Sequence, residues 1–141
     1  LRLLTMIALL LVSLSSVWGA DPELLTGKPY DRTFIDEMSE HHKEGVMMAE
    51  MAVRKAHHSE LKALAEKMVM AQTEEIKMMQ DWRKDWYPRA ADFNSHAVGM
   101  RMERLEALSG EEFDIAFLDS MIMHHPGAIY LGHEAQSRGY H

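Results

Sequence analysis

The chain has 141 residues, which is enough for one domain with a single core. It carries 15 basic and 22 acidic residues, a net charge of −7, which argues against nucleic acid as a partner and suits the attraction of cations. Thirteen methionines and nine histidines stand beside no cysteine, so disulfides and lipid attachment at cysteine are excluded. The ligands that remain for a soft metal such as Cu(I) are thioether and imidazole groups.

Residues 1–20 are predicted to form a signal peptide. Arg2 precedes an apolar run over Leu3–Val12, and small and polar residues follow as far as Ala20. The run is too short to span a bilayer. We therefore expect an exported protein, periplasmic or secreted, with no membrane contact after cleavage; the alternative is a buried N-terminal helix. Residues 21–32 contain two prolines and a glycine and are predicted to be a leader or linker.

Residues 33–141 are predicted to form the helical bundle domain. The first helix should begin near Asp31–Thr33, where Thr33 and Asp36 have the spacing of a capping box, and should run to about Ala56. A short break at His57–Ser59 predicts an antiparallel hairpin with a second helix. The predicted inward face of the first helix consists of Ile35, Met38, His42, Gly45, Val46, Ala49 and Val53, with His41 at its edge.

The second helix should end just before Pro88. Its inward stripe contains Gln72 and Glu75, where apolar residues would be expected. A buried carboxylate needs a partner. We therefore expect Glu75 to meet His42, either as a hydrogen-bond partner or as a fellow metal ligand. The alternative is that the Glu75 side chain extends into solvent.

Residues Pro88–His96 are predicted to be a linker, followed by a turn or short helix over Met100–Leu108. The third long helix should open at Ser109, with Glu112 completing a capping box. Pro126 is expected to kink this helix directly after His125. The predicted inward face consists of Leu118, Met121, His125, Ala128, Ile129, Gly132 and Ala135.

A sequence unit occurs twice. The segments Phe34–His42 and Phe117–His125 are related by a constant offset of 83 residues and keep Phe, Asp, Met, His and His. Repeat 1 spans 33–87, and repeat 2 spans 110–141 and lacks a counterpart of the second helix. The sequence thus predicts an all-α, ferritin-like up-and-down bundle made from a repeated helix pair, in a fragment whose fourth helix is missing. We expect an open apolar groove lined by Met and Leu in its place; the alternative is a natural three-helix protein.

The repeated unit also predicts a metal site. A Met lies four residues before the second His of each pair, so each helix presents a thioether and imidazoles on one face. The spacings of di-iron bundles and of zinc hydrolases are absent. The alternative is that each His pair is a satisfied polar pair in the core. The candidate ligands are Met38, His41, His42, Met48, Glu75, Met79, Met121, His124 and His125.

The pattern Phe-x-Asp-x-Met-x-x-His-His, followed in the first unit by Leu61-x-x-Leu64-Ala65 and Gln72-x-x-Glu75-Ile76, resembles the domain of unknown function 305 family over residues 33–138. The resemblance implies a ferritin-like four-helix bundle, export, and for some members copper binding and resistance. It carries over Met38, His41, His42, Met121, His124 and His125 as ligands. Pro126, the missing last helix and Ser39-Glu40 depart from the family pattern.

These observations predict an exported copper-binding protein that buffers or delivers the metal or confers resistance to it. Cu(I) is favoured, with Ag(I) as its mimic and Cu(II) as a second form, and another periplasmic copper protein is the expected partner. The sequence shows no nucleophile–base pair and no cofactor fingerprint, so we do not expect an enzyme. The alternative function is a structural or protein-interaction bundle without metal.

Overall fold

The computed structural model describes residues 25–90 and 99–141. Four helices account for most of them: α1 (Lys28–Lys55), α2 (Ser59–Trp86), α3 (Gly99–Ala107) and α4 (Gly110–Arg138). The predicted all-α class is therefore confirmed. The predicted signal peptide, the start of the leader and the centre of the linker lie outside the described residues. Within the described part, no helix is both long and apolar enough to cross a membrane.

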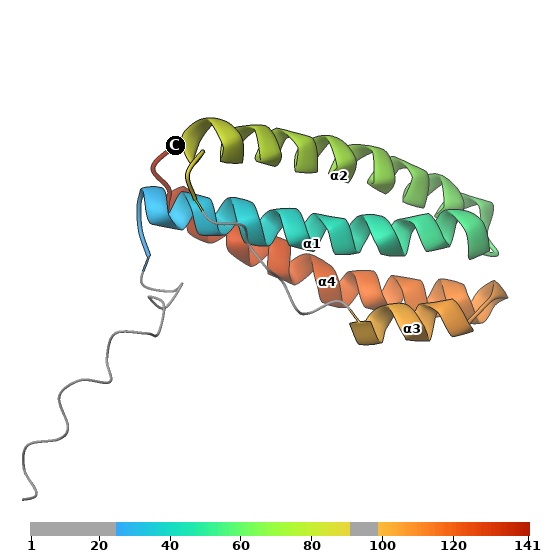
Figure 1. The fold of residues 1–141 in the computed structure, drawn as a ribbon. Coiled ribbons are helices and arrows are strands. Elements are labelled where there is room, and N and C mark those ends of the chain that lie inside the picture. Colours follow the sequence, from blue (N-terminus) through green and yellow to red (C-terminus); the bar gives the residue numbers. More distant parts are fainter. Residues whose placement is uncertain (1–24, 91–98) are drawn as a thin grey trace, which may run out of the picture.

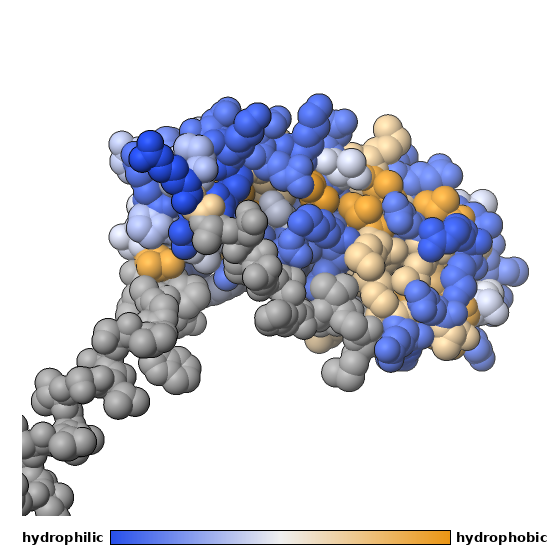
Figure 2. Space-filling view, in the orientation of Figure 1, coloured by the Kyte–Doolittle hydropathy of each residue, from blue (hydrophilic) through white to orange (hydrophobic). Residues whose placement is uncertain are grey.

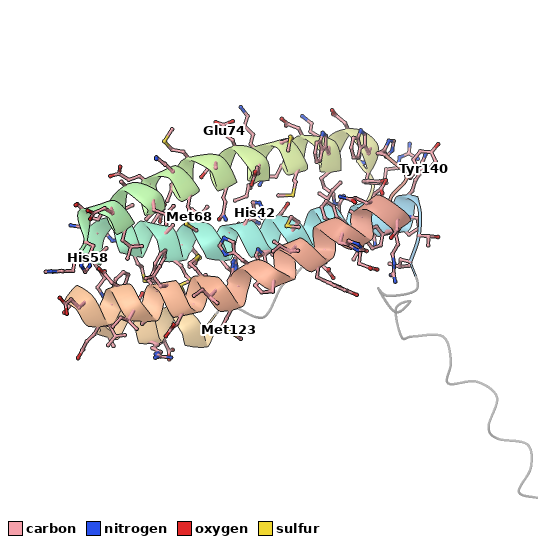
Figure 3. The ribbon with its side chains drawn as sticks, turned by 180° about the vertical axis from the view of Figure 1, so that it is seen from behind. His42, His58, Met68, Glu74, Met123 and Tyr140 are labelled. Atoms are coloured by element: carbon pink, nitrogen blue, oxygen red, sulfur yellow. The ribbon has the colours of Figure 1, made fainter. Side chains whose placement is uncertain are left out.

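The centre of the molecule is α1, which packs against α2 on one side and against α4 on the other (Figures 1 and 3). The short α3 contacts α1 and α4. Lys55, at the end of α1, donates to the carbonyl oxygens of Leu105 and Glu106 and so holds the end of α3. Apolar surface gathers on the half of the molecule that contains α3, whereas the opposite half of the same view is mostly hydrophilic (Figure 2).

Most helix boundaries agree with the prediction, but α1 begins earlier. The hairpin break lies between Lys55 and Ser59, as expected, and α2 ends at Trp86 before Pro88. Helix α1 starts at Lys28, so the predicted leader is helical at its end. The reason is that Gly27 has a φ of 63°, and Pro29 has a backbone already suited to a first helical turn.

Two local predictions about helix caps are wrong. Thr33 lies inside α1 and donates to the Pro29 carbonyl oxygen instead of capping the helix. Ser109 precedes α4 as predicted but forms no side-chain cap hydrogen bond. Helix α4 continues through Pro126, as the predicted inward face required, and the kink at this proline stays a prediction.

The repeat is visible in the contacts that join the two units. Asp114 accepts hydrogen bonds from the backbone N–H groups of His57 and His58, at 2.9 and 3.0 Å. Asp31, which is 83 residues earlier, accepts from the backbone N–H groups of Tyr140 and His141, at 2.7 and 3.2 Å. Each aspartate thus ties the start of its own helix to the turn that follows the other long helix. This reciprocity gives α1 and α4 an approximate two-fold relation.

Buried apolar side chains form two clusters. The larger joins α1, α2, α3 and α4 and contains Met48, Met51, Ala52, Leu61, Leu105, Phe113, Phe117 and Met121, among others. The smaller joins α1 and α2 around Ile35, Met38 and Met79, with Ala128 and Leu131 of α4 packed against it. The histidine pair of α1 lies in the sequence between Met38 and Met48, which belong to different clusters. The two clusters therefore flank a polar layer in the middle of the bundle. We use this name for His41, His42 and the polar side chains around them.

Replacing Asp114 by alanine is expected to destabilise the protein by about 1–2 kcal/mol, the range measured for lost helix caps. The substitution removes the acceptor for two backbone N–H groups at the start of α2. Urea unfolding followed by circular dichroism measures the change. Asp119→Ala, at an exposed position of the same helix, is the control and should change stability by less than about 0.5 kcal/mol. Equal effects of the two substitutions would contradict the capping role of Asp114.

The ion pair between His58 Nδ1 and Asp114 Oδ2, 2.7 Å apart, gives this cap a pH dependence. The hydrogen bond to Asp114 raises the pKa of His58. Burial by itself would raise the pKa of Asp114, but the hydrogen bonds from His58 and His57 hold it below its ordinary value. The stabilisation from His58 is therefore complete below the unfolded pKa of histidine, about 6.5, and is lost as pH rises through the higher folded pKa.

We expect the melting temperatures of wild type and His58→Ala to differ more at pH 6 than at pH 9. Differential scanning calorimetry at the two pH values provides the comparison. His133→Ala changes another exposed histidine, and its melting temperature should differ from that of wild type by the same amount at both pH values. If the difference in melting temperature between wild type and His58→Ala is the same at both pH values, His58 acts only through packing.

Candidate metal centre

Of the histidine pair in α4, the structure buries His124 and leaves His125 exposed. The sequence had placed His125 on the inward face, because it assigned His125 the role of His42, and that placement is wrong. The reason for the difference is that α1 has two helical neighbours and uses two faces, one for each histidine. Among the long helices, α4 packs mainly on α1, through the face that carries His124. His125 donates through Nδ1 to the Met121 carbonyl oxygen at 2.8 Å.

His41 and His124 meet at the centre of the contact between α1 and α4. Their rings are stacked, with centroids 3.6 Å apart and planes inclined by 29°. The two residues are exactly equivalent in the repeat, being separated by 83 positions. The approximate two-fold axis therefore passes between these two imidazoles. Glu44 of α1 lies beside them, with its Oε2 3.8 Å from His124 Nε2.

The hydrogen bond of His41 defines its tautomer. The distance from His41 Nε2 to the His124 carbonyl oxygen is 2.9 Å, and a carbonyl can only accept, so Nε2 carries the proton. Burial lowers the pKa of His41, which keeps the ring neutral near pH 7. Its Nδ1 is then a buried lone pair, with no hydrogen-bond partner among the described residues. Such a nitrogen is chemically suited to bind a metal ion.

His42 has the same arrangement on the other side of α1, between α1 and α2 (Figure 3). Its Nε2 lies 2.7 Å from Glu75 Oε2. The predicted contact between His42 and Glu75 is thereby confirmed as a hydrogen bond. A carboxylate that accepts from Nε2–H fixes the ring and leaves Nδ1 as the lone pair. In the described part of the chain this Nδ1 is also buried without a hydrogen-bond partner.

The four methionines predicted as candidate metal ligands lie in two groups. Met38 and Met79 belong to the smaller cluster, where the hydroxyl of Ser39 contacts the Met79 sulfur at 3.7 Å. Met48 and Met121 belong to the larger cluster. The structure therefore places the Met38 and Met121 sulfurs of the two repeated units in different clusters. The cause is the two-fold relation, which places equivalent methionines on opposite sides of the His41–His124 stack.

Gln72 completes the polar layer. Its side-chain oxygen Oε1 is buried with no hydrogen-bond partner among the described residues, and its amide packs against the backbone of Gly45. A Cβ at position 45 would collide with this amide, so glycine allows the close approach. The sequence indicated Gln72 because it interrupts an apolar stripe. The sequence pattern did not single out Glu44, although Glu44 lies three residues after His41 on the same face of α1.

Across residues 25–90 and 99–141, no group of three histidines or carboxylates converges on a metal-sized point. The donors of the polar layer are instead the Nδ1 atoms of His41 and His42, and buried methionines lie in the cluster on either side of it. That set suits a soft monovalent ion better than a hard divalent ion, which prefers oxygen ligands.

The family model described as Domain of unknown function (DUF305) matches residues 31–141. The chain belongs to this family. A comparison with curated proteins found no match. Solved structures of CopM are similar: its Cu(II)-bound form has 34% identity and a TM-score of 0.67, covering 79% of this chain and 77% of that one. Its Cu(I)-bound form also has 34% identity, with a TM-score of 0.66, covering 75% and 72%.

A DUF305 protein from Streptomyces coelicolor, described as a candidate secreted protein, has a TM-score of 0.69 and 25% identity. The match covers 77% of this chain and 72% of that chain. Silver-bound and apo forms of CopM give similar scores. The DUF305 helical fold is thus shared by proteins solved with and without metal.

Proposed function

We propose that this protein binds copper in the polar layer of its bundle, with Cu(I) as the preferred form. The observation that carries the proposal is the matched state of His41 and His42. Each imidazole donates through Nε2 to a fixed acceptor and keeps a buried Nδ1 lone pair without a hydrogen-bond partner in the described structure. A buried polar atom left in this state costs free energy, and a bound ion would compensate for that cost.

The surrounding donors support the choice of metal. Met38 and Met79 lie on one side of the layer and Met48 and Met121 on the other, all of them buried. Thioethers favour Cu(I) and Ag(I), while neutral imidazoles bind both Cu(I) and Cu(II). Cysteine, the usual competitor for soft metals, is absent from the sequence. CopM, which has been solved with Cu(I), Cu(II) and silver bound, gives this proposal its support from comparison.

The role that we propose is buffering, delivery or resistance without turnover. The predicted signal peptide supports a location in the periplasm or outside the cell, and another periplasmic copper protein would receive the metal. The net charge of −7 favours the approach of cations from solution. The alternative is a structural or interaction bundle in which the histidines serve only packing.

Titration with Ag(I), the redox-silent substitute for Cu(I), distinguishes the two functions. Nitrogen-15 spectra of the histidine rings should show large shifts of His41 and His42 Nδ1 as the metal is added, with His57 and His133 unchanged. A colorimetric Cu(I) chelator in competition should then give the affinity. Shifts confined to exposed histidines, or no competition with the chelator, would favour the structural bundle.

A further inference from the structure

A hollow of about 440 Å³ lies at the end of the bundle where α1 begins and α2 ends (Figure 1). Lys28 and Arg32 line it from the first two turns of α1, and Arg89 lines it from the segment that follows α2. We call Lys28, Arg32 and Arg89 the cationic triad. These three side chains gather around one hollow although the chain as a whole has a net charge of −7. The hollow is therefore locally positive.

The charge of the cationic triad is not compensated within the described part of the chain. Its ammonium and guanidinium groups form no ion pair and no hydrogen bond with the residues that the structure describes. Two carboxylates at this end of α1 already have other partners. Asp31 accepts from the hydroxyl of Tyr87 at 3.0 Å, and Asp36 pairs with Arg83 Nε at 2.7 Å. The triad is thus available to an anionic ligand.

Aromatic rings form one wall of the hollow. Trp86 and Tyr87 line it, with two prolines beside them. Trp86 stacks on Trp82 with ring centroids 5.3 Å apart, which holds the Trp86 ring in place. Burial and the hydrogen bond to Asp31 raise the pKa of Tyr87 to about 12, so its hydroxyl stays neutral near pH 7 and does not repel an anion. The wall suits the apolar body of a ligand whose charged group faces the triad.

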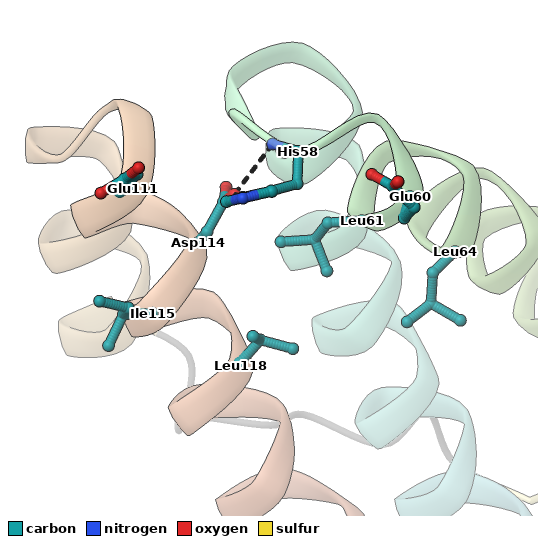
Figure 4. Close-up of a pocket in the computed structure, with 8 residues that line it drawn as sticks. All are labelled: His58, Glu60, Leu61, Leu64, Glu111, Asp114, Ile115 and Leu118. Atoms are coloured by element: carbon teal, nitrogen blue, oxygen red, sulfur yellow. Dashed lines mark hydrogen bonds and ion pairs between the residues drawn. The ribbon is translucent and has the colours of Figure 1, made fainter.

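A larger hollow, between α2 and α4, carries the opposite charge (Figure 4). It is lined by aliphatic side chains and by the carboxylates of Glu60, Glu111 and Asp114, with His58 paired to Asp114. These carboxylates repel an anion. Of the two hollows, the one lined by the cationic triad is therefore the one that suits an anionic ligand.

We propose that the hollow at the start of α1 binds a soluble organic phosphate monoester with an apolar body. Near pH 7 such a phosphate carries a charge of about −1.5 to −2 and three acceptor oxygens, which match three cations better than a singly charged carboxylate does. The forks of Arg32 and Arg89 have the geometry for phosphate oxygens, and the apolar body would lie against Trp86. The volume of the hollow is that of a small-molecule site.

Titration of the metal-free protein with phenyl phosphate tests the proposal, followed by proton–nitrogen NMR spectra. The indole N–H signal of Trp86 should shift progressively, whereas the backbone signals of Leu64 and Leu118, which line the larger hollow, should not move. Benzoate and inorganic phosphate should both bind more weakly than phenyl phosphate. Benzoate has a single charge, and inorganic phosphate has no apolar body.

Replacing Arg32 and Arg89 together by glutamine should weaken the binding of phenyl phosphate by about tenfold or more, because the charge-assisted hydrogen bonds are lost. The matched control is Arg54→Gln with Arg104→Gln, which removes the same charge from exposed positions away from the hollow. It should change the affinity by less than about twofold. All four arginines are exposed, so the fold should survive, and circular dichroism verifies this.

The proposal is wrong if phenyl phosphate does not shift the Trp86 signal, or if both double variants weaken binding equally. It is also wrong if benzoate or inorganic phosphate binds as tightly as phenyl phosphate. Binding to phosphatidylglycerol vesicles without binding to the soluble ester would overturn it as well, since the triad would then serve a membrane surface. None of these results bears on the copper proposal, because the ligands proposed for copper lie in the polar layer.

Discussion

Replacing His41 and His42 together by alanine is expected to weaken Cu(I) binding by about 100-fold or more. The changes remove the two buried Nδ1 atoms that lack hydrogen-bond partners in the described structure. Loss of partners that only orient a metal ligand already costs 10–100-fold in affinity, so loss of both ligands should cost at least as much. Competition with a colorimetric Cu(I) chelator measures the ratio directly.

The matched control is His57→Ala with His133→Ala, which removes the same number of imidazoles from exposed positions. It should leave the affinity within twofold of wild type. His125→Ala should also have a small effect, although the sequence predicted His125 as a candidate ligand on the inward face of its helix. If the His41/His42 variant folds and holds copper as tightly as wild type, the histidines serve the core and the proposed function fails.

Glu75→Gln offers an intermediate test of the same centre. The amide removes the negative charge that holds His42 Nε2–H, so copper affinity should fall by about tenfold, within the range of second-sphere substitutions. The chelator competition described above gives the value. Glu74→Gln, at the neighbouring exposed position, is the control and should behave as wild type. If the copper affinity of Glu75→Gln equals that of wild type, His42 is not a ligand of the metal.

Phe117→Ala is expected to give the largest loss of stability, about 3–5 kcal/mol. Phe117 is buried in the larger cluster and stacks on Phe113, with ring centroids 6.1 Å apart. The cavity left by the ring cannot collapse easily, because α1, α2 and α3 all contribute to the same cluster. For a domain of this size the melting temperature should fall by about 10–20 °C.

Calorimetry or thermal circular dichroism measures this change. Ile122→Ala also truncates an apolar side chain, at an exposed position of α4, and should lower the melting temperature by no more than about 2 °C. A comparable loss for both variants would contradict the assignment of the core to the α1-facing side of α4.

The positions of the helices could be predicted because their ends depend on local chemistry. The hairpin break before Ser59 and the end of α2 before Pro88 follow from residues at those sites. The contact of His42 with Glu75 could also be predicted, because a carboxylate within an apolar stripe needs a partner. These features require knowledge of one helix and its nearest neighbour only.

The orientation of α4 could not be predicted in the same way. The repeat assigns His125 the environment of His42, and that inference holds only where each copy has the same neighbours. Helix α1 packs on two helices and α4 packs on one long helix, so equivalent residues differ in burial. The stacking of His41 on His124 depends on the two-fold relation between distant segments, which no local pattern encodes.

The central position of α1 has a consequence for the order of folding. Helices α1 and α2 are joined by a short turn, so their contacts close a small loop, whereas the contacts of α1 with α4 join residues about 83 positions apart. Closing the longer loop costs more chain entropy, so the hairpin should form first and α4 should dock later. Helix α1 takes part in both steps, and its backbone amides should therefore exchange their hydrogens with solvent more slowly than those of α2 or α4.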